Sequence, residues 1–265
     1  FIIHIVETEY IKLIKKIFMI VIESHKKKIE TIQKMYPGAI IHDVTSHAKD
    51  QFIRFSPFYP VMNIPVPFSP GWTSACVEAI WQGLKVFENA GCDVSLFKNT
   101  TMKNIKRTTR RFGQTKGHKK GVFGDEMLDY IAARKQIYIP AYKWVLDHKL
   151  QFWVNKLRAE SADHTVVLLD YDTNSNVDDP SSPLSHASLI KAYIEGNYPE
   201  CDGQEGSPTK TAEEAESPDF KVGQEVVHPT FGEGTVLKIE GDRIQVKFEV
   251  GVKLLVIRLA HLTCK

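Results

Sequence analysis

The chain has 265 residues and a formal net charge of +2, with 43% hydrophobic and 25% charged residues. This composition is that of an ordinary globular protein and excludes a disordered, collagen-like or coiled-coil architecture for the whole chain. The length suits one sizeable domain plus one small domain. The four cysteines, Cys76, Cys92, Cys201 and Cys264, lack C-x-x-C spacing, so we expect no disulfide framework and a cytoplasmic protein.

The first eighteen residues are rich in isoleucine but are interrupted by glutamates and lysines. Such a segment does not span a bilayer comfortably. It also lacks the basic start and the small-residue exit of a signal peptide. We therefore interpret residues 1–18 as a non-native or upstream extension and expect no membrane contact.

Residues 19–198 are predicted to form an α+β (α/β) large domain. It opens with a strand at 19–23, a basic amphipathic helix at 24–36 and a strand at 39–42, which is a β-α-β pattern. The continuous apolar run at 165–169 is typical of a buried strand. Further helices are expected at about 74–89, 100–112, 124–136, 140–157 and 185–195.

The helix predicted at 74–89 carries a polar stripe made of Glu78, Gln82 and Lys85, beside an apolar stripe. A carboxylate, an amide and an ammonium on one face would suit a site that binds sugar hydroxyls and phosphate while moving protons. The alternative is a solvated face with an ordinary Glu-to-Lys neighbour pair.

The loop in front of this helix reads Phe55-Ser-Pro-Phe-Tyr-Pro60, and the helix follows as Ser74-Ala-Cys-Val-Glu-Ala-Ile-Trp-Gln-Gly-Leu-Lys-Val-Phe87. Together they resemble the NADAR family of N-glycosidases, and the later Lys106-Arg107 with Gly113 is loosely similar to a K-R-x-x-G segment of that family. That family cleaves N-glycosidic bonds in a riboflavin-pathway intermediate and in ADP-ribosylated guanine.

The resemblance implies that Glu78 is the catalytic acid or base. The substrate-binding residues that it implies come from the aromatic loop and from the helix: Phe55, Ser56, Phe58, Tyr59, Gln82 and Lys85. The Trp-Gly pair that follows the closing strand in that family is missing here. Asp170, Asp172 and Asn174 follow the strand instead, and we expect them to supply carboxylates and an amide to the site because ligands in α/β folds bind outside the carboxyl ends of strands. A plain polar turn is the alternative.

A basic run at 103–121 holds eight Lys and Arg residues and no acidic residue. Such a run attracts phosphates, either of nucleic acid or of a nucleotide. The predicted phosphate or nucleic-acid contacts are Lys103, Lys106, Arg107, Arg110 and Arg111. A solvated face or a protein contact is the alternative.

We expect no metal and no cofactor. His42, Asp43 and His47 lie close in sequence, but no further paired ligands follow at helical spacing. Ser46 and the Ser185-His186 pair do not form a hydrolase triad, since the chain has no G-x-S-x-G motif.

Residues 220–265 are predicted to form a small all-β SH3-like or Tudor-like barrel, joined to the large domain by an acidic flexible linker at 199–219. Its apolar residues alternate with a period of two, and Gly-rich turns separate the strands. His228-Pro-x-Phe-Gly-x-Gly-x-Val236 resembles the Tudor-like C-terminal domain of superfamily 1 DNA helicases of the Rep and UvrD type. This implies docking of RNA polymerase, a DNA-processing partner or nucleic acid, while the alternative is a module that only stabilises its neighbour. The helicase motor is not implied, because the chain has no G-x-x-x-x-G-K-[ST] motif.

The sequence therefore predicts a hydrolase that cleaves an N-glycosidic bond in an ADP-ribosyl or other ribosyl-phosphate substrate, including one carried on nucleic acid. The alternative is a non-catalytic interaction protein that binds nucleic acid or RNA polymerase.

Overall fold

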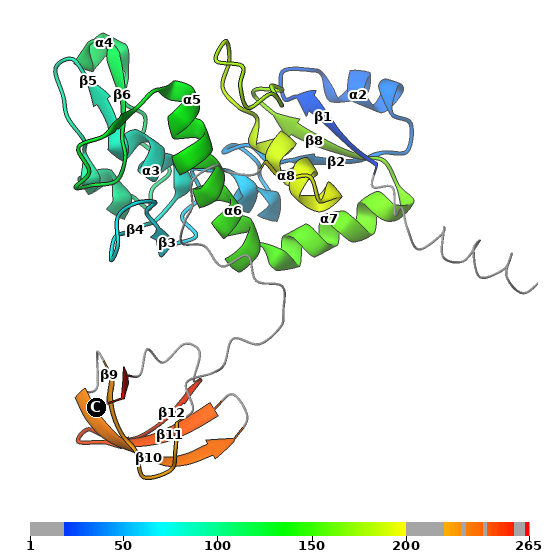
Figure 1. Cartoon of the computed structure of the whole chain (residues 1–265). Coiled ribbons are helices and arrows are strands. Elements are labelled where there is room, and N and C mark those ends of the chain that lie inside the picture. The colour runs from blue at the N-terminus through cyan, green and yellow to red at the C-terminus, as the bar shows by residue number, and fades with distance from the viewer. Residues whose placement is uncertain (1–18, 200–219, 229–231, 241–242, 257–262, 265) are drawn as a thin grey trace, which may run out of the picture. The chain divides into compact units, whose positions relative to one another are not determined.

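The computed structural model describes residues 19–199, 220–228, 232–240, 243–256 and 263–264. The chain divides into two compact units, residues 1–205 and residues 206–265 (Figure 1). The extension expected at 1–18 and all of the expected linker beyond Pro199 lie outside the described residues. No helix in the described part is long and apolar enough to cross a membrane. The predicted mixture of helices and strands, followed by an all-β unit, is confirmed.

A three-stranded parallel sheet forms the centre of the larger unit. In spatial order its strands are β1 (Ile20–Ser24), β8 (Val166–Asp170) and β2 (Ile40–Asp43). Every residue of β8 is buried, because helices cover both faces of the sheet. On one face lies α2 (Ile29–Met35), and on the other lie α7 (Gln151–Asp163) and α8 (His186–Glu195) (Figure 1). The carboxyl ends of the strands meet at one edge, which is where ligands of α/β folds bind.

Residues 51–148 form the rest of the larger unit and contain two small antiparallel sheets. One sheet has the order β5 (Lys85–Phe87), β6 (Thr115–Lys119), β7 (Met127–Leu128), and the other pairs β3 (Ile64–Pro65) with β4 (Thr73–Ser74). The helices of this part are α3 (Val77–Leu84), α4 (Thr109–Phe112), α5 (Tyr130–Ala133) and α6 (Ile139–His148). A single core joins both parts, since Ile80 of α3 and Leu168 of β8 belong to one cluster of buried side chains.

The helix expected at 74–89 ends earlier than predicted. It stops at Leu84, and Lys85 adopts an extended ψ of 134°. Lys85 begins β5, where it pairs with His118 of β6. Pairing with a strand that is distant in sequence thus overrides the local helical pattern.

Other predicted helices are also wrong in extent. The helix expected at 100–112 is reduced to α4, because Met102 and Asn104 have φ values of 59° and 58°, which a right-handed helix excludes. The region expected as a helix at 124–136 begins with β7 instead. The helix expected at 140–157 is two helices, α6 and α7.

The smaller unit is an antiparallel sheet with the strand order β12-β11-β10-β9-β13. Its strands are β9 (Glu225–His228), β10 (Gly232–Glu240), β11 (Arg243–Phe248), β12 (Gly251–Val256) and β13 (Thr263–Cys264). Its core consists of Phe220 together with five apolar side chains from the alternating positions of the predicted strands, namely Val226, Val236, Ile244, Val246 and Phe248. Gly234 allows the Phe248 ring to approach the backbone, because a Cβ there would lie 2.5 Å from the ring. Residues 229–231 lie outside the described part, as do residues 241–242, where the sequence predicted a turn.

Candidate functional site

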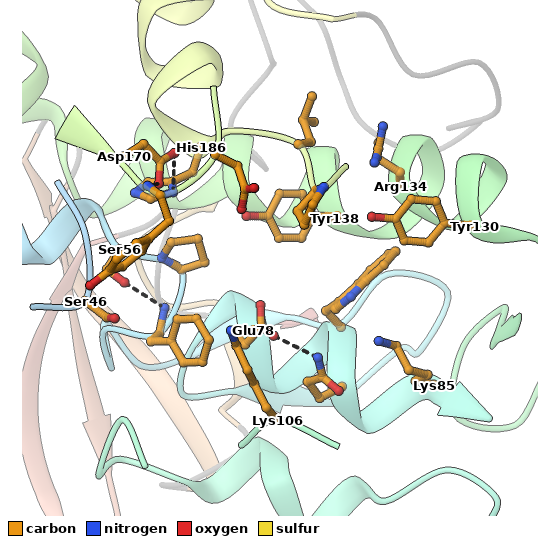
Figure 2. Close-up of a pocket in the computed structure, with 18 residues that line it drawn as sticks. Ser46, Ser56, Glu78, Lys85, Lys106, Tyr130, Arg134, Tyr138, Asp170 and His186 are labelled. Atoms are coloured by element: carbon orange, nitrogen blue, oxygen red, sulfur yellow. Dashed lines mark hydrogen bonds and ion pairs between the residues drawn. The ribbon is translucent and has the colours of Figure 1, made fainter. Parts of the chain in front are cut away.

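A pocket of about 380 Å³ lies at the carboxyl end of β8 (Figure 2). Eight of the residues predicted for the site line it, namely Ser56, Phe58, Glu78, Gln82, Lys85, Lys106, Asp170 and Asp172. The other lining residues are Ser46, Pro57, Trp81, Tyr130, Arg134, Tyr138, Tyr171, Pro183, Leu184 and His186. Figure 2 shows Glu78, Lys85 and Lys106 on one side of the pocket and Asp170, His186 and Tyr138 on the other.

Glu78 lies in the first turn of α3 and is only 8% exposed. The polar stripe of this helix is therefore not a solvated face, contrary to the alternative that the sequence left open. Burial raises the pKa of Glu78, while the hydrogen bond from Gln82 and the charges of Lys106 and Lys85 act in the opposite direction. A buried carboxyl group with a raised pKa can hold a proton closer to neutral pH than an ordinary glutamate, as an acid catalyst must.

Gln82 fixes the position of the Glu78 carboxyl group. Its Nε2 donates to Glu78 Oε1 at 2.9 Å, and its Oε1 accepts a hydrogen bond from the Arg107 backbone N–H at 3.0 Å. The backbone donor determines which way the amide points, so the N–H side must face Glu78. Gln82 lines the pocket, and these two bonds make it a residue that orients Glu78.

Lys85 and Lys106 bring two ammonium groups to the same side of the pocket. Lys85 Nζ lies 5.6 Å from the centroid of the Trp81 ring, and Lys106 Nζ lies 5.5 Å from that of Phe58. Burial lowers the pKa of Lys85, and the charge of Glu78 partly compensates. Within the described residues neither ammonium has a hydrogen bond or an ion pair, so both remain able to bind an anion.

Asp170, by contrast, is held in place on all sides. Its Oδ2 accepts hydrogen bonds from Ser185 Oγ at 2.7 Å, His186 Nδ1 at 3.0 Å and the Ala187 N–H at 3.2 Å, and its Oδ1 accepts one from the Tyr171 N–H at 2.7 Å. Burial alone would raise the pKa of Asp170, but His186 and these donors lower it to about 2. Asp170 is therefore an ionised anchor between β8 and α8.

His186 is the charged partner of Asp170. Its Nε2 lies 2.8 Å from the carbonyl oxygen of Val44, which can only accept a hydrogen bond, while its Nδ1 faces the carboxylate. Both nitrogens must therefore donate, which requires the doubly protonated ring. Burial would lower the pKa of His186, but the charge and hydrogen bond of Asp170 raise it. The side chains of Ser185 and His186 are thus both committed to hydrogen bonds within the fold.

Asp172 is the other carboxylate of this wall. It is half-buried, and no hydrogen bond or ion pair reaches its side chain from the described residues. Burial and the neighbouring charge of Asp170 raise its pKa. Asp172 and Glu78 are therefore the two pocket carboxylates whose oxygens are not saturated by protein donors.

Tyr130, Arg134 and Tyr138 are among the ten lining residues that sequence reasoning did not assign to the site. They follow one another at intervals of four along α5 and the π-helical turn Arg134–Tyr138, so they lie on one face. This spacing was the signal that could have revealed them. The Trp81 ring makes T-shaped contacts with both tyrosines, with centroids 5.7 Å from Tyr130 and 5.8 Å from Tyr138. Burial, with the charge of Glu78, raises the pKa of Tyr138 well above its usual value, so its phenol stays neutral.

Three residues predicted to bind substrate lie elsewhere. Phe55 is fully buried in the core, and its carbonyl accepts a hydrogen bond from Tyr142. Tyr59 lies under the guanidinium of Arg54, outside the pocket lining. Asn174 uses its amide to hold the carbonyls of Asp179 and Ser182 within its own loop.

The basic run does not act as one surface. Lys106 is at the pocket, whereas Lys103, Arg110 and Arg111 are exposed away from it. The prediction for Arg107 is wrong, because its guanidinium turns inward and donates to the carbonyls of Gln82, Lys85 and Gly91 at 3.3, 2.6 and 2.7 Å. It also lies against the rings of Phe87 and Phe112, with its guanidinium carbon 4.9 and 5.0 Å from their centroids. Arg107 thus closes the C-terminal end of α3 and does not offer its charge to a phosphate.

The described residues contain no group of three or more His, Cys, Asp and Glu side chains that could hold a metal ion. His42 is used in the fold, since its Nε2 lies 2.7 Å from Glu160 and its ring stacks on Phe52.

The fold and the pocket define an α+β protein with a polar, aromatic-walled binding site at the end of a buried parallel strand. Comparison with protein families identifies the family of the chain. The model of a family of unknown function, DUF6939, matches residues 24–190, and the chain belongs to that family. All the residues that line the pocket fall inside this match, and the smaller β unit falls outside it. No curated protein matches the chain.

Proposed function

We propose that the pocket binds a ribosyl-phosphate compound, such as an ADP-ribosyl group, and hydrolyses its N-glycosidic bond. The observation that carries this proposal is the combination of a buried carboxyl group, Glu78, with two unpaired ammonium groups and an aromatic wall in one cavity. The carboxyl group of Glu78 can protonate the leaving nucleobase, and the ammonium groups of Lys85 and Lys106 can bind the phosphate. The rings of Trp81 and Phe58 can stack on the nucleobase.

The proposed reaction uses the two unsaturated carboxylates in different roles. Protonated Glu78 gives its proton to the leaving nitrogen as the bond to C1′ breaks and the electron pair moves to the base. The sugar develops oxocarbenium character, and a water molecule adds to C1′ while Asp172 accepts its proton. The raised pKa of each carboxyl group supports both roles, since an acid must hold its proton and a base must take one up.

The test is whether the whole chain hydrolyses either of two probes, an oligonucleotide carrying ADP-ribosylated guanine and a ribosylaminopyrimidine phosphate. The assay measures the released base and sugar. Glu78→Gln should lower kcat by at least a hundredfold. Its melting temperature should stay about the same, because glutamine can still accept from Gln82 and, like a protonated carboxyl group, carries no charge. Glu30→Gln, an exposed change on α2, is the matched control. If the wild-type chain converts neither probe, the proposal fails.

One observation favours a second candidate, binding of nucleic acid without catalysis. Lys103, Arg110 and Arg111 are exposed and are not committed to the pocket. The double variant Arg110→Ala/Arg111→Ala should weaken binding of a DNA or RNA oligonucleotide and reduce its salt dependence by roughly one unit of slope for each lost contact. An unchanged slope would assign these arginines to a solvated face.

The smaller unit supports a further part of this proposal, a Tudor-like barrel that docks nucleic acid or RNA polymerase. The support is its five-stranded antiparallel order and its compact core of alternating residues. Purified RNA polymerase or an oligonucleotide should bind the whole chain and not a shortened chain of residues 1–205. Equal binding by both chains would remove the docking role.

A further inference from the structure

The pocket wall opposite Glu78 includes an irregular loop, residues 171–184, that joins β8 to α8. Four of its residues, Tyr171, Asp172, Pro183 and Leu184, line the pocket. Both ends of the loop are tied to Asp170, at the Tyr171 N–H and at the Ser185 hydroxyl. A compact loop with its ends close together is an Ω-loop, and its shape depends on what fills its interior.

The side chain that fills this loop is Arg134. It is 2% exposed. Its Nη1 donates to the carbonyls of Asn176, Val177 and Asp179 at 3.3, 2.9 and 2.8 Å, and its Nη2 donates to that of Ser182 at 3.0 Å. Figure 2 shows Arg134 beside Tyr130, and its guanidinium carbon lies 4.7 Å from the centroid of that ring.

These contacts account for an arginine at this position. Buried backbone carbonyls need donors, and one planar guanidinium supplies five N–H groups in a fixed fork. A lysine would supply three donors on one atom and could not reach carbonyls on both sides of the loop. No carboxylate lies within ion-pair distance of Arg134 among the described residues, so its hydrogen bonds are directed to the loop backbone.

We propose that Arg134 is a positioning residue that holds residues 171–184 as a wall of the pocket and keeps Asp172 in the same cavity as Glu78. Asn174 assists it, because its amide reaches the carbonyls of Asp179 and Ser182 from within the loop. The effect of Arg134 on turnover rests on the proposed function, whereas its effect on the conformation of residues 171–184 does not.

The test of the clamp is hydrogen exchange in the peptide that covers residues 171–184. Arg134→Ala should increase the exchange rate of its protected amides, such as those of Asn176 and Asp179, by at least tenfold. Millimolar guanidinium chloride should restore protection by occupying the vacated space, while the same concentration of sodium chloride should not. Arg110→Ala, an exposed change on α4, should leave the exchange of this peptide unchanged.

The second readout is catalysis with the two glycosidic probes. Arg134→Ala should lower kcat/KM by about a hundredfold, because displacement of a catalytic group by about 1 Å costs that much, and guanidinium should recover part of the loss. If Arg134→Ala does not fold, Arg134→Lys carries the same comparison, since it keeps the charge and loses the fork. Exchange that is unchanged in the variant would overturn the clamp even in an active enzyme. A wild-type chain without activity would overturn the proposed function and leave the exchange result to decide the clamp.

Discussion

Replacement of Asp170 by asparagine should destabilise the larger unit by removing the partner of a buried imidazolium. The pKa of Asp170 is lowered from 3.8 to about 2, which corresponds to about 2 kcal/mol of stability at neutral pH. Loss of one member of a buried ion pair can cost somewhat more, about 3 to 5 kcal/mol, because the remaining charge stays buried. For a unit of this size, at roughly 2 to 4 °C for each kcal/mol, we expect the melting temperature to fall by about 4 to 20 °C.

The directions of the two pKa shifts determine how the stability of the larger unit changes with pH. The folded pKa of Asp170 lies below its unfolded value, so its contribution is present above about pH 4 and is lost as the pH falls towards 2. The folded pKa of His186 is raised, so its contribution is present below about pH 6.5 and is lost as the pH rises through the folded value. Wild-type stability should therefore decline on both sides of this window, and Asp170→Asn should flatten both declines.

The assay is thermal unfolding of the whole chain followed by tryptophan fluorescence. All four tryptophans lie in the larger unit, so the signal reports on that unit alone. Asp172→Asn is the matched control, because the pKa of Asp172 is raised and its neutralisation removes no favourable charge. We expect the control to keep or slightly raise the melting temperature. Equal losses in both variants, or a loss in Asp170→Asn that does not change with pH, would refute the ion-pair argument.

Three further predictions follow from single side chains. Gln82→Ala should raise the pKa of Glu78 further, because it removes the hydrogen bond that favours the carboxylate. It should lower kcat/KM for the glycosidic probes by about tenfold, the value of one hydrogen bond to the carboxylate that forms as Glu78 gives up its proton. Unchanged kinetics would contradict the orienting role of Gln82. Arg107→Ala should lower the free energy of unfolding, measured in urea, by about 2 to 3 kcal/mol, because it removes hydrogen bonds to backbone carbonyls. Arg111→Ala should lower it by less than about 0.5 kcal/mol. Equal effects of the two variants would contradict the structural role of Arg107. His118→Phe should raise the melting temperature, because neither ring nitrogen of His118 has a hydrogen-bond partner in the described part and burial lowers the pKa of the ring to about 3. A large fall in the melting temperature would contradict this and indicate a hydrogen bond to the ring.

The sequence could predict the elements whose pattern is local. The apolar run of β8 identified a buried strand, and its end identified the edge where Asp170 and Asp172 lie. The i, i+4 spacing placed Glu78 and Gln82 on one face of α3. The periodicity of a helix shows which residues share a face, but it does not show which other segment packs on that face. The contact of α3 with the loop at Pro57, whose carbonyl accepts a hydrogen bond from the Glu78 N–H, could therefore not be inferred.

The parts that could not be predicted depend on contacts between distant segments. Lys85 leaves the helix because it pairs with His118, and Arg107 turns inward because the carbonyls at the end of α3 need donors. The polar segment after β8 reads as a turn until Arg134, far away in sequence, is placed inside it. In each case the local residues are compatible with several structures, and a non-local hydrogen bond selects one.

Hydrogen-bond partners also separate the charged groups of the pocket into two kinds. Asp170 accepts four hydrogen bonds and His186 donates with both nitrogens, so a change in the protonation of either group breaks a hydrogen bond at the junction of β8 and α8. Glu78 has one side-chain donor, and Asp172 has none among the described residues. Glu78 and Asp172 are therefore the two pocket carboxylates whose oxygens are not saturated by protein donors, and the ion pair beside them forms the end of the strand from which Asp172 projects.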